Sequence, residues 1–271
     1  MNHIHTNSRF FIERAYNQQQ TDMKNLHSHG YYELYYLTSG KRKYFLDNAL
    51  YQLEEGNLIL IPPNVLHRSI SMEKSNYSRI LVNIPATYPE DKVISDYLNK
   101  SIPGIINIPS KRRGYFEGLL QKLESESLKS DEYSEYLIRY YINEIVIFIN
   151  RIVSGTQAPT ITNQSDYIIN NASKYIKDNF DKAISLEAVA DSVGMSKTYF
   201  SKLFRKKTGF GFSDYLTSVR MSEAAKLLNN TNLSVTEIAL KCGYNDSAYF
   251  TASFRKHNGI SPLKYRNSTK M

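Results

Sequence analysis

The sequence predicts an α+β protein with an antiparallel β-barrel in its N-terminal part and an all-α domain in its C-terminal part. Three observations lead to this prediction. Short runs of alternating apolar and polar residues fill residues 25–69. Apolar residues at helical spacing follow from residue 115. One segment then occurs twice, with Phe204 and Phe254 as equivalent positions. The 271 residues are enough for two domains that each bury a core.

The N-terminal runs are typical of strands. They read YYELYYL, KYFL, ALYQL and NLILI, and they are separated by turn signals at Ser39-Gly40, Asp47-Asn48 and Glu55-Gly56. Alternation bounded by such turns predicts a series of antiparallel strands. A barrel of this kind encloses space for a small ligand. We therefore assign residues 1–105 to a ligand-sensing barrel, in which inward and outward side chains cannot be told apart without the strand register.

Two helices are expected to flank the barrel, in residues 106–153. The first has one apolar face, formed by Tyr115, Phe116, Leu119, Leu120 and Leu123. The second, residues 133–153, is apolar almost all round, with Tyr136, Leu137, Tyr140, Tyr141 and residues 145–149. One stripe suffices to cover a barrel, so the second favours a partner helix. A monomer with this helix buried between two domains is the alternative.

The positive charge is concentrated in the C-terminal part. The net charge is +8, and residues 165–271 hold 16 Lys and Arg against 9 Asp and Glu. Residues 1–164 hold 18 against 17. Between these parts lies SGTQAPTITNQ, a polar stretch with Gly and Pro, which predicts a linker at residues 154–164. The domain at 165–271 is therefore the basic one.

The repeated segment predicts two helix-turn-helix units, at about residues 185–206 and 234–256. SLEAVADSVGMSKTYFSKLFRKKTG aligns with SVTEIALKCGYNDSAYFTASFRKHNG, with one residue inserted at the second turn. Ser185 is a candidate N-cap, and Ser234 with Glu237 matches a capping box. Gly194 and Gly243 stand where a left-handed residue would end the first helix.

The second helix of each unit combines an aromatic stripe with a polar, basic face. The stripes, Tyr199, Phe200, Leu203 and Phe204 in one copy and Tyr249, Phe250 and Phe254 in the other, are expected to be buried. A basic helix of this kind fits a DNA major groove, where small residues approach base edges and cations reach phosphates. A linking helix at residues 213–228 would set the units about one DNA turn apart. The expected DNA contacts are Ser196, Lys197, Thr198, Ser201, Lys202, Arg205, Lys206, Ser247, Ala248, Thr251, Ala252, Arg255 and Lys256.

Residues 238–266, IALKCGYNDSAYFTASFRKHNGISPLKYR, resemble the signature of the AraC/XylS family of bacterial transcriptional regulators. The resemblance implies sequence-specific binding of double-stranded promoter DNA by both units, with a small-molecule effector, dimerisation and activation together with RNA polymerase. Its base-facing positions fall on Thr198, Ser201, Lys202, Ser247, Ala248, Thr251 and Ala252. The family commonly has a basic residue at the position of Ala252, so the second unit is expected to depend more on phosphate contacts.

The N-terminal spacing resembles the cupin barrel. His27, His29, Glu33 and Gly40 fit a first motif, and Gly56, Pro62 and His67 fit a second. In metal-binding cupins the positions matching His27, His29, Glu33 and His67 converge, and such a set would suit Fe, Mn, Ni or Zn. We instead expect no metal and no other cofactor. The predicted effector-binding residues are His27, His29, Glu33, Tyr35 and His67.

Together these features predict a ligand-responsive transcriptional activator and not an enzyme. Two alternatives stay open: a metal-dependent cupin enzyme fused to a DNA-binding domain, and an architectural DNA-binding protein without a ligand. No Gly-rich phosphate loop or G-x-S-x-G elbow supports catalysis, and no catalytic residue is predicted. The single Cys242 favours a reducing compartment, and no segment is apolar enough for export or a membrane span. The cytoplasm is the predicted location, without a membrane partner.

Overall fold

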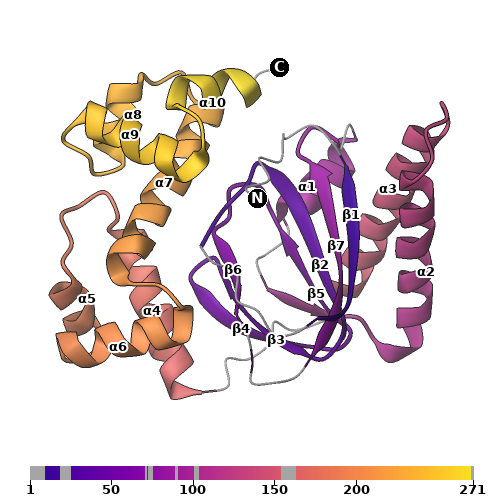
Figure 1. Ribbon diagram of the computed structural model, residues 1–271, viewed down its shortest axis with the longest axis horizontal. Coiled ribbons are helices and arrows are strands. Elements are labelled where there is room, and N and C mark those ends of the chain that lie inside the picture. The colour runs from indigo at the N-terminus through magenta and orange to yellow at the C-terminus, as the bar shows by residue number, and fades with distance from the viewer. Residues whose placement is uncertain are drawn as a thin grey trace.

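The computed structural model describes residues 10–18, 26–70, 72, 76–88, 91–100, 104–153 and 163–269. Most of the predicted linker, residues 154–162, lies outside the described residues. Within them the chain forms a β-sheet part followed by a helical part, and the two lie side by side (Figure 1). The predicted α+β class is confirmed.

The N-terminal part contains two antiparallel sheets. One has the strand order β1-β7-β2-β5-β8, and the other has the order β4-β3-β6. The strands of the first are β1 (Phe11–Gln18), β7 (Tyr77–Pro85), β2 (Tyr31–Ser39), β5 (Asn57–Ile61) and β8 (Ile105–Asn107). Those of the second are β4 (Ala49–Glu54), β3 (Lys41–Leu46) and β6 (His67–Ile70). The turns between consecutive strands fall where the sequence predicts them, with positive φ at Gly40, Asp47, Asn48 and Gly56.

The register of β2 decides which side chains face the other sheet. Leu34 pairs with Val82 of β7 and with Leu60 of β5. Tyr35 and Leu37 belong to the buried cluster between the sheets, together with Tyr44 and Leu46 of β3. Leu34 and its alternate neighbours Tyr32 and Tyr36 belong to the cluster on the opposite face. Odd-numbered residues of β2 therefore point inward, and Glu33 has the same parity.

Three helices cover the outer face of the five-stranded sheet: α1 (Lys92–Lys100), α2 (Ser110–Ser127) and α3 (Ser134–Val153). In α2 the predicted apolar face is buried except for Tyr115, which is 55% exposed, so its assignment to that face was wrong. The inner stripe of α3 is Ile142, Ile145, Val146, Ile149 and Ile152. The second stripe, Tyr136, Leu137 and Tyr140, lies on the surface with Tyr133.

The C-terminal part consists of seven helices in the described residues. These are α4 (Gln164–Asp178), α5 (Leu186–Ser192), α6 (Lys197–Thr208), α7 (Phe212–Asn230), α8 (Val235–Lys241), α9 (Ser247–Asn258) and α10 (Pro262–Thr269). The helix pairs α5–α6 and α8–α9 are the predicted units, and α7 links them (Figure 1). The N-terminal half of α7 contributes Tyr215 and Val219 to one core. Its C-terminal half contributes Met221 and Leu228 to another.

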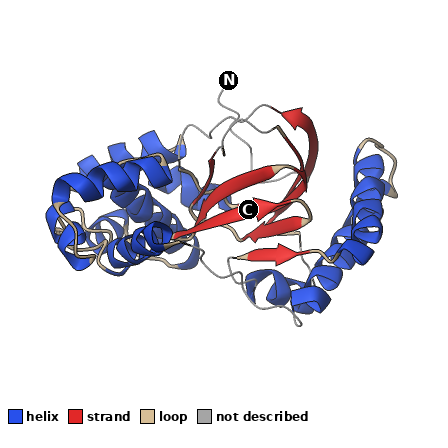
Figure 2. Ribbon diagram, turned by 90° about the horizontal axis from the view of Figure 1, so that it is seen from below, coloured by secondary structure: helices blue, strands red, loops and turns tan. Residues whose placement is uncertain are grey.

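The first of these cores extends into the sensor. Phe45 of β3 makes edge-to-face contacts with Phe210 and Tyr215, with ring centroids 5.3 and 5.5 Å apart. Leu50 and Ile70 of the same three-stranded sheet belong to this cluster. The molecule is therefore layered: helices, the five-stranded sheet, the three-stranded sheet, and the C-terminal helices (Figure 2). The sequence did not predict this shared core.

Candidate nucleic-acid interface and sensor site

Local capping positions the first helix of each unit. The Ser185 hydroxyl accepts a hydrogen bond from the Ala188 amide at 3.1 Å. Ser234 and Glu237 form the predicted capping box, with the Glu237 amide donating to Ser234 Oγ at 3.2 Å and the Ser234 amide donating to Glu237 Oε2 at 2.7 Å. These three hydrogen bonds satisfy amides that the start of a helix leaves unpaired.

The turn and the second helix also follow local sequence. Gly194 and Gly243 adopt φ of 68° and 75°, as predicted for the residue that ends the first helix. Asp246 Oδ1 accepts hydrogen bonds from the Ala248 and Tyr249 amides, at 2.7 and 3.0 Å. Ser196 occupies the equivalent position before α6, but its side chain makes no cap bond. The start of α9 is thus held more firmly than the start of α6.

The thirteen residues predicted to contact DNA all reach the surface. Twelve are exposed, and Thr251 is half-buried. On the opposite face Phe200, Phe204, Phe250 and Phe254 are fully buried, which confirms that part of the predicted stripe. Each second helix is therefore anchored by two phenylalanines and presents its other face outward.

The assignment of Tyr199 and Tyr249 to the buried stripe was wrong. Their exposed fractions are 59% and 66%. Each precedes a buried Phe, and consecutive helical residues are about 100° apart, which places the Tyr at the border of the core. These rings therefore adjoin the polar face. The repeat places a tyrosine at this border position in both units, but it places the buried Phe200 and Phe250 in the same way, so repetition alone did not mark the tyrosines as exposed.

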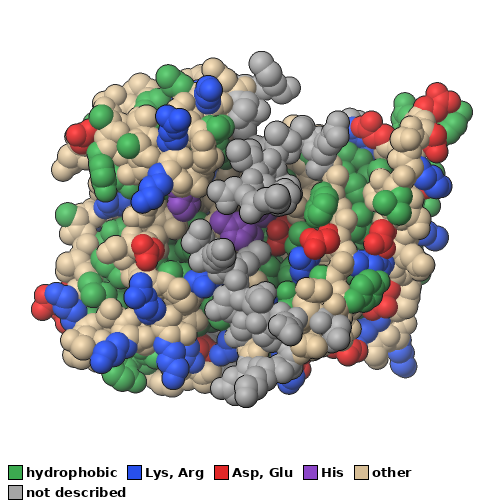
Figure 3. Space-filling model, viewed as in Figure 1, with side chains coloured by type: hydrophobic (Ala, Val, Ile, Leu, Met, Phe, Trp, Pro, Cys, Tyr) green, Lys and Arg blue, Asp and Glu red, His purple; other side chains and the backbone are tan. Residues whose placement is uncertain are grey.

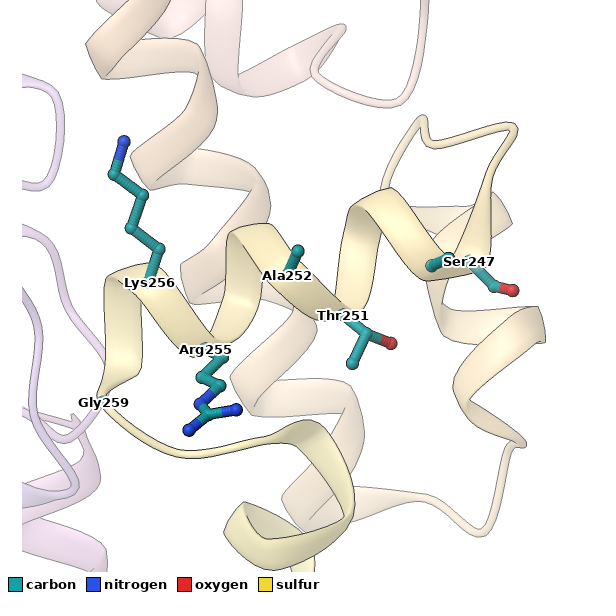
Figure 4. A pocket seen from close by; sticks show the side chains of 7 residues that line it. Ser247, Thr251, Ala252, Arg255, Lys256 and Gly259 are labelled. Atoms are coloured by element: carbon teal, nitrogen blue, oxygen red, sulfur yellow. The ribbon is translucent and has the colours of Figure 1, made fainter.

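A hollow of about 720 Å³ runs along the outer face of α9 (Figure 4). Short side chains occupy the N-terminal half, and cationic side chains occupy the C-terminal half. Short side chains permit close approach of the helix backbone to base edges, whereas Lys and Arg reach phosphates. Six of the seven lining residues are in the predicted set: Ser247, Ala248, Thr251, Ala252, Arg255 and Lys256, with Gly259 as the seventh.

The cations of α6 are divided between two faces. Lys202, Arg205 and Lys206 are exposed on the outer face. Lys207 points toward the domain interior, where its Nζ lies 2.8 Å from Asp166 Oδ1 of α4. Lys and Arg side chains are distributed over the surface of the C-terminal helices (Figure 3). The outer cations are placed to meet a polyanion, and Lys207 is placed to hold α4 against α6.

The predicted sensor residues converge at one end of the two sheets. His27 and His67 are paired through their backbones, with N···O distances of 3.2 and 2.9 Å. The ring centroid of His67 lies 4.3 Å from that of His27 and 4.8 Å from that of His29. Glu33 Oε2 lies 3.3 Å from His29 Nε2. Histidine side chains are visible between the two parts of the molecule (Figure 3).

Burial and charge act in opposite directions on this cluster. Burial raises the pKa of Glu33, but the contact with His29 and the nearby imidazoles outweigh it and lower the pKa to about 2. Burial lowers the pKa of His67 well below its usual value. The site thus contains a carboxylate beside a neutral imidazole. Tyr35 is also inward, but it lies beside Tyr44, with ring centroids 4.9 Å apart.

Sequence reasoning missed two arginines between the sheets. Arg42 is 1% exposed, lies 4.4 Å above the Tyr77 ring, and donates from Nη2 to Ser69 Oγ at 2.8 Å. Arg79 pairs with Glu13 at 3.3 Å. The signal for Arg42 was its parity with Tyr44 and Leu46 on the same strand, both of which are buried.

Two family models match the chain. The description "AraC-like ligand binding domain" matches residues 11–91, and "Helix-turn-helix domain" matches residues 189–268. Among the residues that the structure describes, no helix is long and apolar enough to cross a membrane.

Curated relatives are similar over most of the chain. The activator RhaR of Enterobacter sp. is 24% identical over 252 residues, which cover 90% of this chain and 87% of that protein. The lactose operon transcription activator of Staphylococcus xylosus is 28% identical over 246 residues, covering 86% and 83%.

Two solved structures are also similar. The C-terminal domain of AraT, a response regulator from Geobacillus stearothermophilus, is 36% identical with a TM-score of 0.37, covering 39% of this chain and 88% of that chain. ToxT from Vibrio cholerae is 15% identical with a TM-score of 0.40, covering 96% and 97%. The matched families are regulators and not enzymes. The chain belongs to the AraC family of transcriptional regulators, with an AraC-like ligand-binding domain followed by a helix-turn-helix DNA-binding domain.

Proposed function

We propose that the chain activates transcription by placing α6 and α9 in two successive major grooves on one side of promoter DNA. The observation that carries this proposal is the exposure of both polar, basic helix faces while both aromatic faces are anchored on α7. The 19 residues of α7 span about 28 Å at 1.5 Å per residue. This length is comparable to the roughly 34 Å of one DNA turn.

The two helices divide base reading and phosphate binding differently. On α6, Thr198, Ser201 and Lys202 are proposed to meet bases, with Ser196, Lys197, Arg205 and Lys206 on phosphates. On α9, Ser247, Ala248, Thr251 and Ala252 are proposed to meet bases, chiefly through van der Waals contact with thymine methyl groups, while Arg255 and Lys256 bind phosphates. The absence of a cation at Ala252 makes α6 the stronger reader.

Activation, dimerisation and location are parts of the same proposal. The curated relatives named above are described as activators, which supports a productive contact with RNA polymerase. The exposed stripe of Tyr136, Leu137 and Tyr140 on α3 supports a homodimer. Residues 1–105, 106–153 and 165–271 then act as sensor, dimerisation segment and DNA-binding domain. A protein that acts on promoter DNA and has a single buried thiol, Cys242, belongs in the cytoplasm.

The sensor is proposed to respond to a small effector held near His27, His29, Glu33, Tyr35 and His67. The effector shifts the equilibrium between two arrangements of the domains because it binds one arrangement more tightly than the other. The size of the shift is limited by the difference between those two affinities. The shared apolar core gives the sensor direct mechanical contact with α6 and α7.

The proposal is tested with a binding site selected from a pool of random duplexes. Lys202→Ala is expected to weaken binding to the selected site by about 1–3 kcal/mol and to weaken binding to scrambled DNA much less. Lys207→Ala is the matched control, because it removes the same charge from the same helix on the inward face. Equal losses on both DNAs for Lys202→Ala would show that Lys202 contacts only phosphate.

A further inference from the structure

In two imidazoles of the histidine cluster, a hydrogen bond to a backbone carbonyl determines which ring nitrogen carries the proton. His29 Nδ1 lies 3.0 Å from the Tyr31 carbonyl oxygen, and His67 Nδ1 lies 2.9 Å from the Val65 carbonyl oxygen. A carbonyl oxygen only accepts hydrogen bonds, so each Nδ1 must donate. In the neutral ring the lone pair is then on Nε2. Both Nε2 atoms are turned toward Glu33, at 3.3 and 4.0 Å from its Oε2.

This arrangement leaves buried polar atoms without partners. His67 Nε2 and Glu33 Oε1 have no hydrogen-bond partner among the described residues, and both side chains are buried. His67 directs the lone pair of its Nε2 toward the Glu33 carboxylate. Unpaired buried acceptors are costly, and facing acceptors repel each other. A cation between the rings and the carboxylate would satisfy both.

The donor set fits a transition-metal ion. One ring nitrogen from each of His27, His29 and His67 lies within 4.8 Å of the others. First-row divalent ions bind imidazole nitrogen at about 2.0–2.1 Å, so two such nitrogens on one ion lie at most about 4.2 Å apart. The 4.8 Å span of the three rings would therefore have to close by about 0.6 Å or more when one ion binds. In metal sites, the ring nitrogen that does not bind the ion usually donates a hydrogen bond that fixes the orientation of the imidazole. The Nδ1–H bonds of His29 and His67 to backbone carbonyls are of this kind.

Asn64 connects the same cluster to α7 and α10, the helices that flank the second helix-turn-helix unit, and Tyr265 of α10 packs on Phe254 of α9 with ring centroids 5.5 Å apart. The Asn64 amide donates to the His29 carbonyl at 2.7 Å. The Asn64 carbonyl accepts from Ser222 Oγ of α7 at 2.7 Å, and its Oδ1 accepts from the Tyr265 hydroxyl of α10 at 3.1 Å. Asn64 adopts φ of 60°, in the left-handed region, which the contacts on both sides hold in place. These bonds connect the backbone of His29 to α7 and α10.

We propose that His27, His29, His67 and Glu33 bind one divalent transition-metal ion. We further propose that this ion is an effector, which acts on the second helix-turn-helix unit through Asn64. The effector role of the ion rests on the proposed function, whereas metal binding by these residues is independent of it. It replaces the expectation that these residues bind no metal.

Metal binding is tested on the full chain, purified without an affinity tag or chelator. Mass spectrometry and a Co²⁺ titration followed by visible absorption are expected to show one ion per chain, bound with a dissociation constant of about 1 μM or tighter. His67→Ala and Glu33→Gln are expected to weaken binding roughly 100-fold or more. His257→Gln is the control: it removes the remaining described histidine, which lies near His27 but outside the four-residue set, and it is expected to retain the ion.

A folding defect is separated from a lost ligand by a conservative variant. His29→Cys keeps a metal-binding donor, so it is expected to retain Co²⁺ and to add a thiolate charge-transfer band in the near ultraviolet. Circular dichroism checks that every variant is folded. A chain without bound metal, or one whose Co²⁺ spectrum is unchanged in folded His67→Ala and Glu33→Gln, would overturn the proposal.

The effector half is tested by DNA affinity with Zn²⁺ added or removed. We expect a change of about fivefold or more at the selected site. The double variant Ser222→Ala with Tyr265→Phe removes both bonds to Asn64, so it is expected to abolish this change while metal binding stays intact. Equal affinity with and without Zn²⁺ in the unmodified chain would reject the ion as an effector. That result is distinct from failure of the DNA-binding proposal, which is judged by Lys202→Ala alone.

Discussion

The two helix-turn-helix units share one sequence pattern but have different surroundings. The first unit shares an apolar core with the sensor, in which Phe45 contacts Phe210 and Tyr215. The second unit has a core of its own, around Phe250 and Phe254. The helices that flank it, α7 and α10, meet the sensor through hydrogen bonds at Asn64. The repeated sequence forms the same local fold twice, but each copy contacts the sensor in a different way, because its neighbouring elements differ.

The difference in attachment has an energetic consequence. Separation of an apolar interface costs about 25 cal/mol per Å² of surface exposed to water. Hydrogen bonds exchange partners with water at a net cost of about 0.5–1.5 kcal/mol each. The first unit therefore moves together with the sensor, while the second reorients more easily. The proposed response to an effector would therefore change the spacing of the two reading helices chiefly by moving the second unit.

The largest expected effect comes from removing one core phenylalanine from each unit. Phe204→Ala and Phe254→Ala are each expected to destabilise the protein by about 3–5 kcal/mol, because both rings are fully buried. Urea unfolding measures this loss. Hydrogen exchange should increase in β3 for Phe204→Ala, because Phe204 belongs to the cluster shared with the sensor, but not for Phe254→Ala. Unchanged exchange in β3 for both variants would contradict the shared core.

A second prediction adds to α9 the cation that it lacks. Ala252→Lys is expected to strengthen DNA binding by about 1.5 kcal/mol or more, as for a hydrogen bond to a charged group. It should also steepen the dependence of log affinity on log salt by about one. Fluorescence anisotropy at several salt concentrations measures both quantities. Leu128→Lys, which adds the same charge on the exposed end of α2, should leave the slope unchanged. A matching change in that control would mean that net charge alone is responsible.

The smallest expected effect compares the two N-caps. Asp246→Ala should lower the free energy of unfolding by about 1 kcal/mol, because it removes two hydrogen bonds to the first turn of α9. Ser196→Ala should leave stability nearly unchanged, because the Ser196 side chain makes no cap bond. Thermal unfolding of the two variants measures the difference. Equal losses would show that Ser196 does cap α6 in solution.

Much of the C-terminal domain could be predicted because its signals are local. Ser234 and Glu237 are three residues apart, and Gly243 ends its helix through its own backbone freedom. Such features depend on neighbours within about one helical turn. Tyr199 and Tyr249 could not be placed correctly, because a residue at the border of a helix face is buried or exposed according to what packs beside it.

The sensor site could be predicted only in part. The resemblance to the cupin barrel implied that His27, His29, Glu33 and His67 converge, and the structure brings them together. The orientation of the imidazoles depends on the Tyr31 and Val65 carbonyls, whose directions follow from the backbone of β2 and of the segment before β6. The inward position of Arg42 likewise needed the register of β3.

The sequence by itself determined the two parts, the repeated units, their caps and turns, and the basic face of each second helix. Only the tertiary structure decided that Phe45, on the outer face of the three-stranded sheet, contacts Tyr215, 170 residues later in the chain. It also decided that Asn64 connects the histidine cluster to α7 and α10. The physical reason is that caps, turns and periodicity act between near neighbours. Apolar contacts are not directional, so an apolar side chain does not specify its distant partner. The shape and register of the folded elements determine which partner it contacts.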